Sequence, residues 1–430
     1  MNQIDDMFRR VDEQIIERMA TARCPGMAVA FVDRQRCVRI ATYGVVSLET
    51  RAPVTPQTRF RIGSITKSFV ALAVVQLAQR GELDLHRPVV EYLPWWSVAT
   101  RYAPITLHHL LTHTAGLVVV VDRSPDQRGA VWALRETETA WAPGERFHYS
   151  DAGYQTLALV LVRVTGVPFA EVIATQILAP LGMRSSVAAV TQDLRPLLAT
   201  GYRDPYDDRP SDPTRPLVPA PFLEVEAGDC SIASTAEDMA AYARLLLNAG
   251  RGPQSTLLAP EWFHRLTHPH THTGSRGTHY GYGIELRTMD GRVHLEHGGG
   301  VPGFVAHLNV DRDSGVAVVT LSTTPHVSGI SWEILRAWRA ASLGEPLEPF
   351  TIPAPRPATS QTTSTAVDAA DGVPAAWGMY PGHFRAHNPW ATNFRVVLRP
   401  PHLWLIWPHG GEERLIPYDG SNAPEGEFYV

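Results

Sequence analysis

The residues Gly63-Ser64-Ile65-Thr66-Lys67-Ser68-Phe69 open a strongly apolar helix, predicted over 64–79 and ended by Gly81. Residues three positions apart share a helix face, so the Ser64 hydroxyl and the Lys67 amine can meet. A serine attacks well when a base takes its proton, and lysine can do so if burial or nearby positive charge lowers its pKa. N–H groups at the helix start would help to hold an oxyanion. The spacing indicates nucleophilic catalysis, although a capping serine beside a surface lysine has the same pattern.

Lys67 is the only lysine among the 38 basic residues of the chain. Arginine can replace lysine wherever a solvated positive charge is enough, but a guanidinium does not lose its proton in proteins. A lysine that survives where every other basic residue is arginine is therefore a candidate for proton chemistry. The alternative is chance retention in an arginine-rich chain.

The bulk composition is that of a folded enzyme-sized chain of 430 residues, with 44% hydrophobic and 19% charged residues. A net charge of −5 gives no general reason to expect nucleic acid or an anionic membrane as a partner. Cys24, Cys37 and Cys230 show neither CxxC spacing nor a disulfide framework. The first ten residues are polar, without an apolar secretory core, so the cytoplasm is the expected location.

The hydrophobic periodicity predicts an α+β fold. The predicted helices and strands follow one another as helix 3–20, strands 26–32 and 37–43, helices 64–79, 153–165, 168–178 and 235–248, strands 280–287, 292–296, 303–311 and 315–323, and helix 328–342. Strands at both ends with helices between them imply an antiparallel sheet built from both termini, flanked by helices, with a mostly helical insertion.

The domain prediction places a catalytic domain at 1–348 and a linker at 349–374, which is rich in Pro, Ala, Thr and Ser. A small β domain at 375–430 follows. Its strand candidates are 394–398, 402–407, 414–418 and 427–430. Four strands in so short a segment make a marginal unit, expected to pack on something else.

Two further segments carry candidate site residues. In His148-Tyr149-Ser150-Asp151, Tyr149 could relay protons to a leaving group, although a half-buried, hydrogen-bonded tyrosine is the commoner case. In the segment 296–303 (EHGGGVPG), consecutive glycines let the backbone approach a ligand and offer an N–H to an oxyanion. His297 could bind a substrate carboxylate or carbonyl. A plain glycine-rich hairpin is the alternative.

Six ordered segments together resemble the serine β-lactamase and penicillin-recognising superfamily. They are most similar to the branch that holds class C β-lactamases, family VIII carboxylesterases and D-amino-acid-specific peptidases. The segments are SITK (64–67), HLLTHTAGL (109–117), YSD (149–151), APLGM (179–183), SIASTAEDM (231–239) and HGG (297–299). The resemblance covers about residues 10–343 and implies the β-lactamase/transpeptidase-like fold.

The resemblance also assigns roles. It implies that Ser64 forms the acyl-enzyme, that Lys67 is its base partner, and that Tyr149 shares the base work and protonates the leaving group. The oxyanion hole would be formed by the N–H groups of Ser64 and Gly300, beside Gly298 and Gly299. Two positions depart from the family pattern.

His297 stands where many class C enzymes have lysine, and Asp151 replaces the common asparagine that bonds a substrate amide. Both departures favour another acyl substrate over a β-lactam. The 377–430 segment is similar to the start of a lipocalin-like β domain, too short for a full barrel.

The expected activity is hydrolysis of small esters, amides or peptides, including D-configured ones, with no cofactor and no metal. A weak β-lactamase and a non-hydrolytic penicillin-binding sensor or interaction protein remain as alternatives. A homo-oligomer formed through the C-terminal β segment is also left open. The histidines at 264, 268, 270, 272 and 279 lack nearby carboxylates at ligand spacing, and His108, His109 and His113 are interpreted as packing and hydrogen-bonding residues. Gly298-x-Gly300-x-x-Gly303 matches a dinucleotide fingerprint in letters only, because a strand follows it.

Overall fold

The computed structural model describes residues 3–119, 126–206, 212, 214–327, 329–348, 375–385, 393–407, 412–417 and 428–429. The chain divides into two compact units. The larger one comprises Met1–Tyr202 and Pro219–Pro353, and the smaller one comprises Arg203–Val218 and Ala354–Val430. The predicted linker at 349–374 lies outside the described residues.

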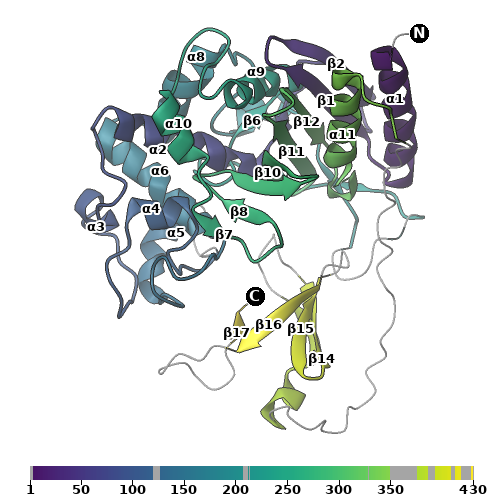
Figure 1. Ribbon diagram of the computed structural model, residues 1–430. Coiled ribbons are helices and arrows are strands. Elements are labelled where there is room, and N and C mark those ends of the chain that lie inside the picture. The colour runs from purple at the N-terminus through teal and green to yellow at the C-terminus, as the bar shows by residue number, and fades with distance from the viewer. Residues whose placement is uncertain are drawn as a thin grey trace. The chain divides into compact units, whose positions relative to one another are not determined.

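Eight antiparallel strands form the sheet of the larger unit, in the order β2-β1-β12-β11-β10-β9-β8-β7 (Figure 1). They are β1 (Gly26–Asp33), β2 (Cys37–Gly44), β7 (Thr271–His272), β8 (Thr278–Tyr280), β9 (Glu285–Met289), β10 (Arg292–Val301), β11 (Phe304–Asp311) and β12 (Val316–Ser322). β1 pairs with β12, with Met27 opposite Ser322, so the two ends of the unit meet in mid-sheet. The predicted α+β fold, with a sheet built from both termini, is confirmed.

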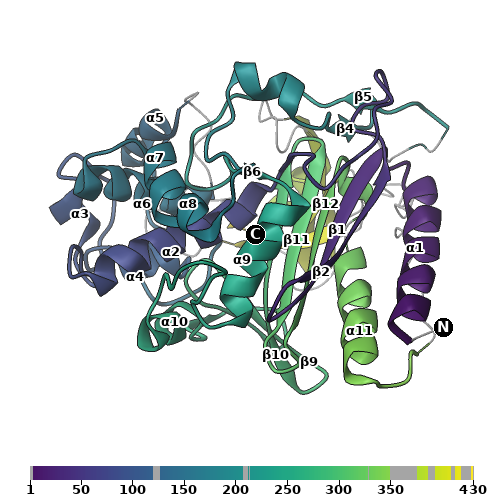
Figure 2. The same cartoon turned by 90° about the horizontal axis from the view of Figure 1, so that it is seen from above.

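Helices cover both faces of this sheet (Figure 2). α1 (Gln3–Thr21) and α11 (Ile330–Leu343) lie on one face, where they share a hydrophobic core with Met27, Val29 and Phe31 of β1. The alternate side chains of β1 belong to the second, larger core on the other face, where α9 (Ala236–Leu247) packs. β1 is thus apolar along its whole length because both of its faces are buried.

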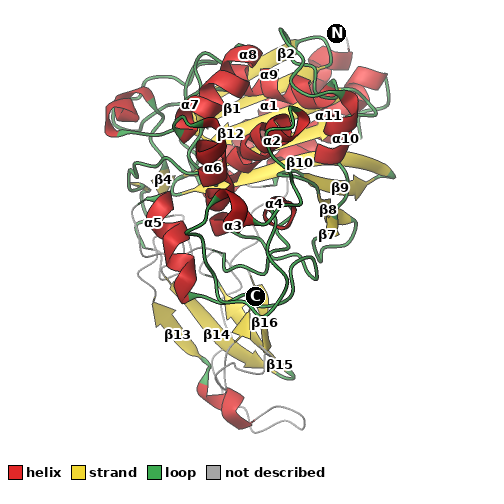
Figure 3. Ribbon diagram, turned by 90° about the vertical axis from the view of Figure 1, so that its left-hand side faces the viewer, coloured by secondary structure: helices red, strands yellow, loops and turns green. Residues whose placement is uncertain are grey.

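The helical insertion lies between β2 and β7, and Figure 3 draws its helices in red, as it does α1 and α11. Its remaining helices are α2 (Thr66–Gln79), α3 (Val89–Tyr92), α4 (Leu107–Leu111), α5 (Gln127–Trp132), α6 (Asp151–Thr165), α7 (Phe169–Ile173), α8 (Ala179–Leu181) and α10 (Pro260–Leu266). Its short strands are β3 (Phe60–Arg61), β4 (Tyr202–Arg203), β5 (Val218–Pro219) and β6 (Ala233–Ser234). β3 pairs with β6.

No described helix is by itself long and apolar enough to cross a bilayer. One pair of consecutive helices, Asp151–Thr165 and Phe169–Leu181, meets the criteria of length and composition when the two are taken together, but the pair is bent by 81°.

Two predicted strand boundaries are wrong. The strand expected over 280–287 is split into β8 and β9, because the chain turns at Gly283, which has a φ of +68°. The glycine run expected to follow a strand ending at 296 instead lies inside β10, with Gly299 opposite Ala306 of β11. Sheet pairing to β11 keeps these glycines extended although their intrinsic strand preference is low.

The smaller unit contains a five-stranded antiparallel sheet in the order β13-β14-β15-β16-β17. The strands are β13 (Gly382–Arg385), β14 (Asn393–Arg399), β15 (His402–Ile406), β16 (Glu412–Pro417) and β17 (Phe428–Tyr429). The sequence predicted the last four and missed β13. Among the described residues of this sheet, the buried hydrophobic cluster is small and consists of Val396, Leu403 and Leu405.

Candidate active site

Ser64 lies in the 3₁₀ turn Gly63–Ile65, which leads directly into α2. Lys67 stands on the first turn of α2, and its side chain is fully buried. Its Nζ lies 3.0 Å from the Ser64 Oγ, so the two side chains meet across one helical turn, as the spacing predicts. Ser64 is half-buried.

Lys67 has three acceptors for its three ammonium hydrogens. Besides Ser64 these are an Asp151 carboxylate oxygen at 2.7 Å and the Asp229 backbone carbonyl at 3.1 Å. Burial alone would lower the pKa of Lys67, but the negative charge of Asp151 and the nearby Tyr149 and Asp229 outweigh it, so the pKa is raised. A lowered pKa, the condition under which a lysine acts as a free base, is therefore not met in this structure. Lys67 is an ammonium in the resting site.

Tyr149 is held beside this pair by the start of α6. Ser150 caps the helix, with its Oγ accepting the Gly153 N–H at 3.1 Å. Its own N–H donates to Nδ1 of the buried His113 at 3.0 Å, and the His113 ring lies 4.2 Å from the Tyr149 ring. Lys67 Nζ lies 4.8 Å from the centre of the Tyr149 ring, and both Lys67 and Ser64 lower the pKa of the phenol. Burial raises the pKa of Tyr149 to about 12, against the lowering effect of Lys67, so the phenol is neutral.

His113 was interpreted from the sequence as a packing and hydrogen-bonding residue, and the structure shows which hydrogen bond it makes. It is the residue that fixes the backbone next to Tyr149, and its φ of +56° is a strained value for a side-chain-bearing residue. Burial lowers the pKa of His113 well below its usual value, and Lys67 lowers it further, so the ring is neutral and Nδ1 can accept the Ser150 N–H. No feature of the segment 109–117 in the sequence indicated this contact.

Asp229 is the site residue that the sequence analysis missed. Its backbone carbonyl accepts from Lys67, and its buried carboxylate accepts from the Gln155 amide at 3.2 Å. Burial raises the pKa of Asp229, Asp151 raises it further, and Lys67 opposes both. The one feature of the sequence that could have indicated Asp229 is its position, two residues before the segment 231–239.

The glycine run of β10 lies directly against Ser64. A methyl group on Gly299 would come within 1.9 Å of the Ile62 carbonyl oxygen, and one on Gly63 within 2.7 Å of the Gly300 nitrogen. Gly300 itself is exposed, with open space on its side-chain side. Because Gly63 and Gly299 have no side chain, the Gly300 backbone can lie beside Ser64. This is where the family resemblance implies an oxyanion donor. Gly298, half-buried, lies one residue further from Ser64, opposite His307.

His297 does not offer a positive charge to the site. Its ring is 2% exposed, with Nδ1 bonded to the Gly298 carbonyl at 2.6 Å and Nε2 to the Tyr280 hydroxyl at 3.0 Å. Since a carbonyl only accepts, Nδ1 carries the hydrogen and Nε2 accepts from Tyr280. Burial lowers the pKa of His297 to about 3, and Lys67 contributes. In this conformation both ring nitrogens are already bonded within the protein.

The structure thus brings together Ser64, Lys67, Tyr149, Asp151 and the Gly300 backbone, with His297 buried behind them. Within the described part of the chain, no three histidine, cysteine or acidic side chains are arranged to hold a metal ion. The glycines of the fingerprint-like segment lie in β10 and in the turn to β11, and no helix follows them.

Comparison with known proteins identifies a matching family model and several similar curated proteins. A family model described as Beta-lactamase matches residues 11–337. The Beta-lactamase of Escherichia coli (strain K12) is 29% identical over 204 residues, which is 47% of this chain and 53% of that protein. The D-aminopeptidase of Gluconobacter oxydans (strain 621H) is 27% identical over 357 residues, 80% of this chain and 64% of that protein. Esterase EstB of Burkholderia gladioli is 32% identical over 228 residues, 48% of this chain and 56% of that protein.

The matched segments span between 53% and 64% of the lengths of these curated relatives. Among solved structures, an octameric penicillin-binding protein homologue from Pyrococcus abyssi superposes with a TM-score of 0.71 at 23% identity, covering 95% of this chain and 90% of that one. At this identity the likeness supports the fold.

Proposed function

The chain belongs to the beta-lactamase family, and on that premise we propose that it is a serine hydrolase that works through an acyl-enzyme on Ser64. The observation that carries the proposal is the 3.0 Å contact between the Ser64 Oγ and the Nζ of the buried Lys67. A nucleophile needs a partner for its proton within hydrogen-bond reach, and this is the only lysine in the chain.

The proton of Ser64 needs a route, because Lys67 is already an ammonium. We propose that Lys67 transfers one proton to the Asp151 carboxylate, at 2.7 Å, while it takes the proton of Ser64, at 3.0 Å. In sum, the hydroxyl proton ends on Asp151, Lys67 stays charged, and the Oγ electron pair forms the bond to the acyl carbon. An asparagine at position 151 could not accept this proton.

The rest of the cycle uses the other polar groups. The N–H groups of Ser64 and Gly300 are proposed to stabilise the oxyanion, since preorganised donors are effective where charge develops. The leaving group departs with a proton supplied through Tyr149, which is neutral, or through Lys67. The proton on Asp151 then returns through Lys67 to the group that supplied it. Water attacks the acyl carbon and gives one proton to the pair of Lys67 and Asp151. The bond between the acyl carbon and the Ser64 Oγ breaks, this proton passes back to Oγ, and the acid is released.

Small esters, and amides or peptides next to small or D-configured residues, are the proposed substrates. Position 297 holds a neutral, internally bonded ring, and Asp151 adds a carboxylate. Neither group favours the carboxylate that β-lactam antibiotics carry. The names of two relatives, a D-aminopeptidase and an esterase, support the same substrate classes.

The direct test is a substrate panel on the wild type and on Ser64→Ala. We expect cleavage of p-nitrophenyl acetate or butyrate and of D-alanyl p-nitroanilide, with nitrocefin the poorest substrate. Ser64→Ala should lose at least about a thousandfold in rate, as removal of a catalytic serine does elsewhere. Equal turnover by this variant would exclude the proposed nucleophile.

A non-hydrolytic acyl sensor is the second candidate, favoured by one observation. Lys67 has all three ammonium hydrogens bonded, which leaves no free base for the water that must release the acyl group. Mass spectrometry after addition of substrate separates the two functions. A stable adduct on Ser64 without product would favour the sensor, and continuous product release would favour the hydrolase.

We also propose a homo-oligomer formed through the C-terminal sheet. Its edge strands β13 and β17 each have one unpaired side within the described sheet, and unpaired edges are the usual sites of strand addition between chains. The octameric neighbour supports the idea. Light scattering of the full chain and of a chain ending at residue 353 tests it, since the shorter chain should lose the assembly.

A further inference from the structure

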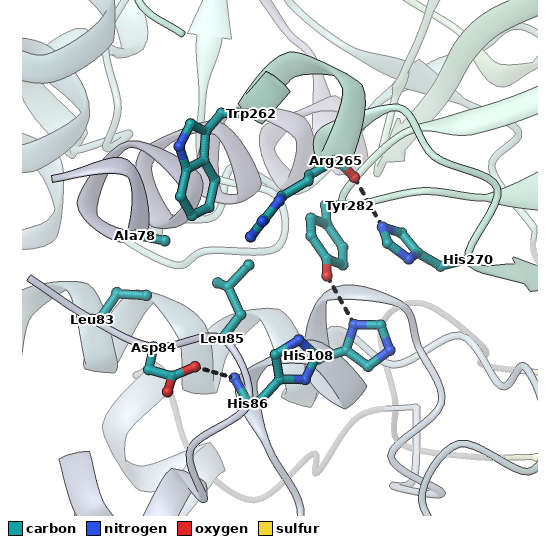
Figure 4. Close-up of a pocket in the computed structure, with 10 residues that line it drawn as sticks. All are labelled: Ala78, Leu83, Asp84, Leu85, His86, His108, Trp262, Arg265, His270 and Tyr282. Carbon is teal, nitrogen blue, oxygen red and sulfur yellow. Dashed lines mark hydrogen bonds between the residues drawn. The ribbon is translucent and has the colours of Figure 1, made fainter. Parts of the chain in front are cut away.

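A cavity of about 510 Å³ lies near the far end of α2 from Lys67. Ala78, one of its lining residues, follows Lys67 by 11 positions on this helix, which corresponds to about 16 Å. Leu83 and Leu85 line it on one side, and Trp262 of α10 lines it on another (Figure 4). The cavity is therefore separate from the Ser64 site.

Histidines gather around this cavity. The ring centroids of His86 and His108 lie 5.3 Å apart, and those of His108 and His270 also lie 5.3 Å apart. Further imidazoles extend the cluster, namely His109 at 5.7 Å from His108, His268 at 5.0 Å from His270, and His264 at 5.7 Å from His268. A third of the 18 histidines of the chain meet here.

An arginine without an ionic partner lines the same cavity. The Arg265 guanidinium lies 4.5 Å from the centre of the Trp262 ring. Among the described residues, no carboxylate lies within ion-pair distance of Arg265, whereas many arginines of the chain are paired. Figure 4 shows its guanidinium inside the ring of lining residues. Its five N–H donors are thus available for a ligand.

The hydrogen bonds around the cavity determine which ring nitrogen of His108 and of His270 can take up a proton. His270 Nε2 lies 2.9 Å from the Arg265 carbonyl oxygen. Since a carbonyl only accepts, Nε2 carries the hydrogen and Nδ1 of the neutral ring has none. His108 Nδ1 bonds the Tyr282 hydroxyl at 2.9 Å. Burial lowers the pKa of His108 to about 4, with further lowering by His270, and burial also lowers the pKa of His270.

We propose that this cavity binds a small oxyanion, a carboxylate or phosphate group, through Arg265 and the imidazoles of His86, His108 and His270. The anion supplies the negative charge that lets His270 take up a proton and turn Nδ1 into a donor. The aromatic and aliphatic walls leave room for an organic group attached to the anion.

The charged and titratable groups around the cavity come from every segment that borders it. They are Asp84 and His86 after α2, His108 and His109 on α4, His264 and Arg265 on α10, His268 and His270 before β7, and Tyr282 between β8 and β9. Asp84 is the one carboxylate among the lining residues, and it already accepts the His86 backbone N–H at 2.9 Å. It opposes the anion, so its removal should strengthen binding.

Calorimetric titration of the full chain with sulfate tests the site, because sulfate keeps its charge across the pH range used. We expect saturable binding that tightens by up to about tenfold per pH unit on acidification from pH 7.5 to 5.5, since one proton is taken up with the anion. Arg265→Gln should weaken binding by about tenfold or more, as expected for loss of a charged hydrogen bond. Asp84→Asn should tighten it, and His270→Gln should flatten the pH dependence.

Arg135→Gln is the matched control, because Arg135 also stacks on a tryptophan, Trp132, at 3.9 Å but lines none of this cavity. Its sulfate binding should equal that of the wild type. Acetate and inorganic phosphate, titrated in the same way, tell whether the planar or the tetrahedral oxyanion fits better, and Arg265-dependent binding of either supports the site. The proposal is overturned if no ion binds saturably or if Arg265→Gln and Arg135→Gln behave alike.

Discussion

Lys67 is surrounded by acceptors, and this decides how the proton of Ser64 can move. Its Nζ has Ser64, Asp151 and the Asp229 carbonyl within 3.1 Å. The negative charge of Asp151, 2.7 Å away, raises the pKa of Lys67, so the site favours the ammonium over the neutral amine. The base that we propose is therefore the pair of Lys67 and Asp151 rather than lysine alone.

Lys67→Arg should lower kcat for p-nitrophenyl acetate by about a hundredfold or more, because a guanidinium cannot exchange protons between Ser64 and Asp151. Steady-state kinetics measures this. Arg80→Lys, an exposed basic change at the other end of α2, should leave kcat unchanged. Near-normal turnover by the Lys67 variant would show that the site needs only a positive charge.

Asp151→Asn separates the two roles of the pair through its pH profile. The variant removes the proton acceptor, so kcat near pH 7 should fall by about tenfold to a hundredfold. It also removes the negative charge that raises the pKa of Lys67. The pKa of this buried lysine then falls, and the activity of the variant should rise with pH above 7 while the wild type stays flat. A variant as active as the wild type at pH 7 contradicts the relay.

β10 serves the sheet and the site at the same time. Its first half pairs with both β9 and β11, and its glycine half continues along β11 while its other side lies against the Gly63–Ile65 turn. The position of the Gly300 N–H, the proposed oxyanion donor, therefore depends on the same hydrogen-bond ladder that holds the sheet together. Substitutions at neighbouring glycines of this strand should therefore lower the free energy of unfolding by very different amounts.

Gly299→Ala and Gly300→Ala form a matched pair within β10. The new methyl group at 299 would overlap the Ile62 carbonyl, whereas at 300 it would meet open space. We expect Gly299→Ala to lower the free energy of unfolding by about 3 kcal/mol or more, and Gly300→Ala by less than about 1 kcal/mol. Urea denaturation measures both, and equal losses would contradict the close backbone contact.

Glu285 of β9 predicts a pH-dependent stability. It lies directly opposite Glu296 of β10, and burial, with the repulsion of Glu296, raises its pKa to about 7. Between about pH 4.5 and 7 the folded state holds a proton that the unfolded state has lost, so stability falls as the pH rises through this window.

Glu285→Gln should therefore stabilise the protein by about 1–2 kcal/mol at pH 8 and have little effect at pH 4.5. Thermal denaturation at the two pH values measures the difference. The control is Glu261→Gln, a change on the exposed side of α10. A stabilisation that is the same at both pH values would exclude the titration of Glu285 as its cause.

At the scale of the molecule, the two units have very unequal cores. The larger unit has two extensive hydrophobic clusters on the two sides of its sheet, whereas the described residues of the smaller sheet form one buried cluster of three side chains. Stability grows with the apolar surface buried, so the smaller unit should be the weaker one.

Scanning calorimetry should therefore show two transitions, with the smaller unit unfolding first. A chain that ends at residue 353 should lose the lower transition and keep the upper one within about 3 °C. The contrary result would be a single transition in the full chain and no transition in the chain that ends at residue 353. It would indicate that each unit is stabilised by the other.

The sequence by itself determined the fold class, the alternation of strands and helices, and the contact between Ser64 and Lys67. Periodicity and helical spacing are local properties, so residues 26–44, 64–79 and 235–248 could be assigned without tertiary information. The smaller sheet was recovered except for β13, a four-residue strand.

Only the tertiary structure decided the charge of Lys67. Asp229 lies 162 positions away from it in the chain, and Asp151 lies 84 positions away, so neither contact is visible in any local pattern. The same holds for His113 beside Tyr149, and for His86, His108 and His270 around one cavity. Electrostatic energy depends on distance in space and on burial, and these are set by how the insertion folds back onto the sheet.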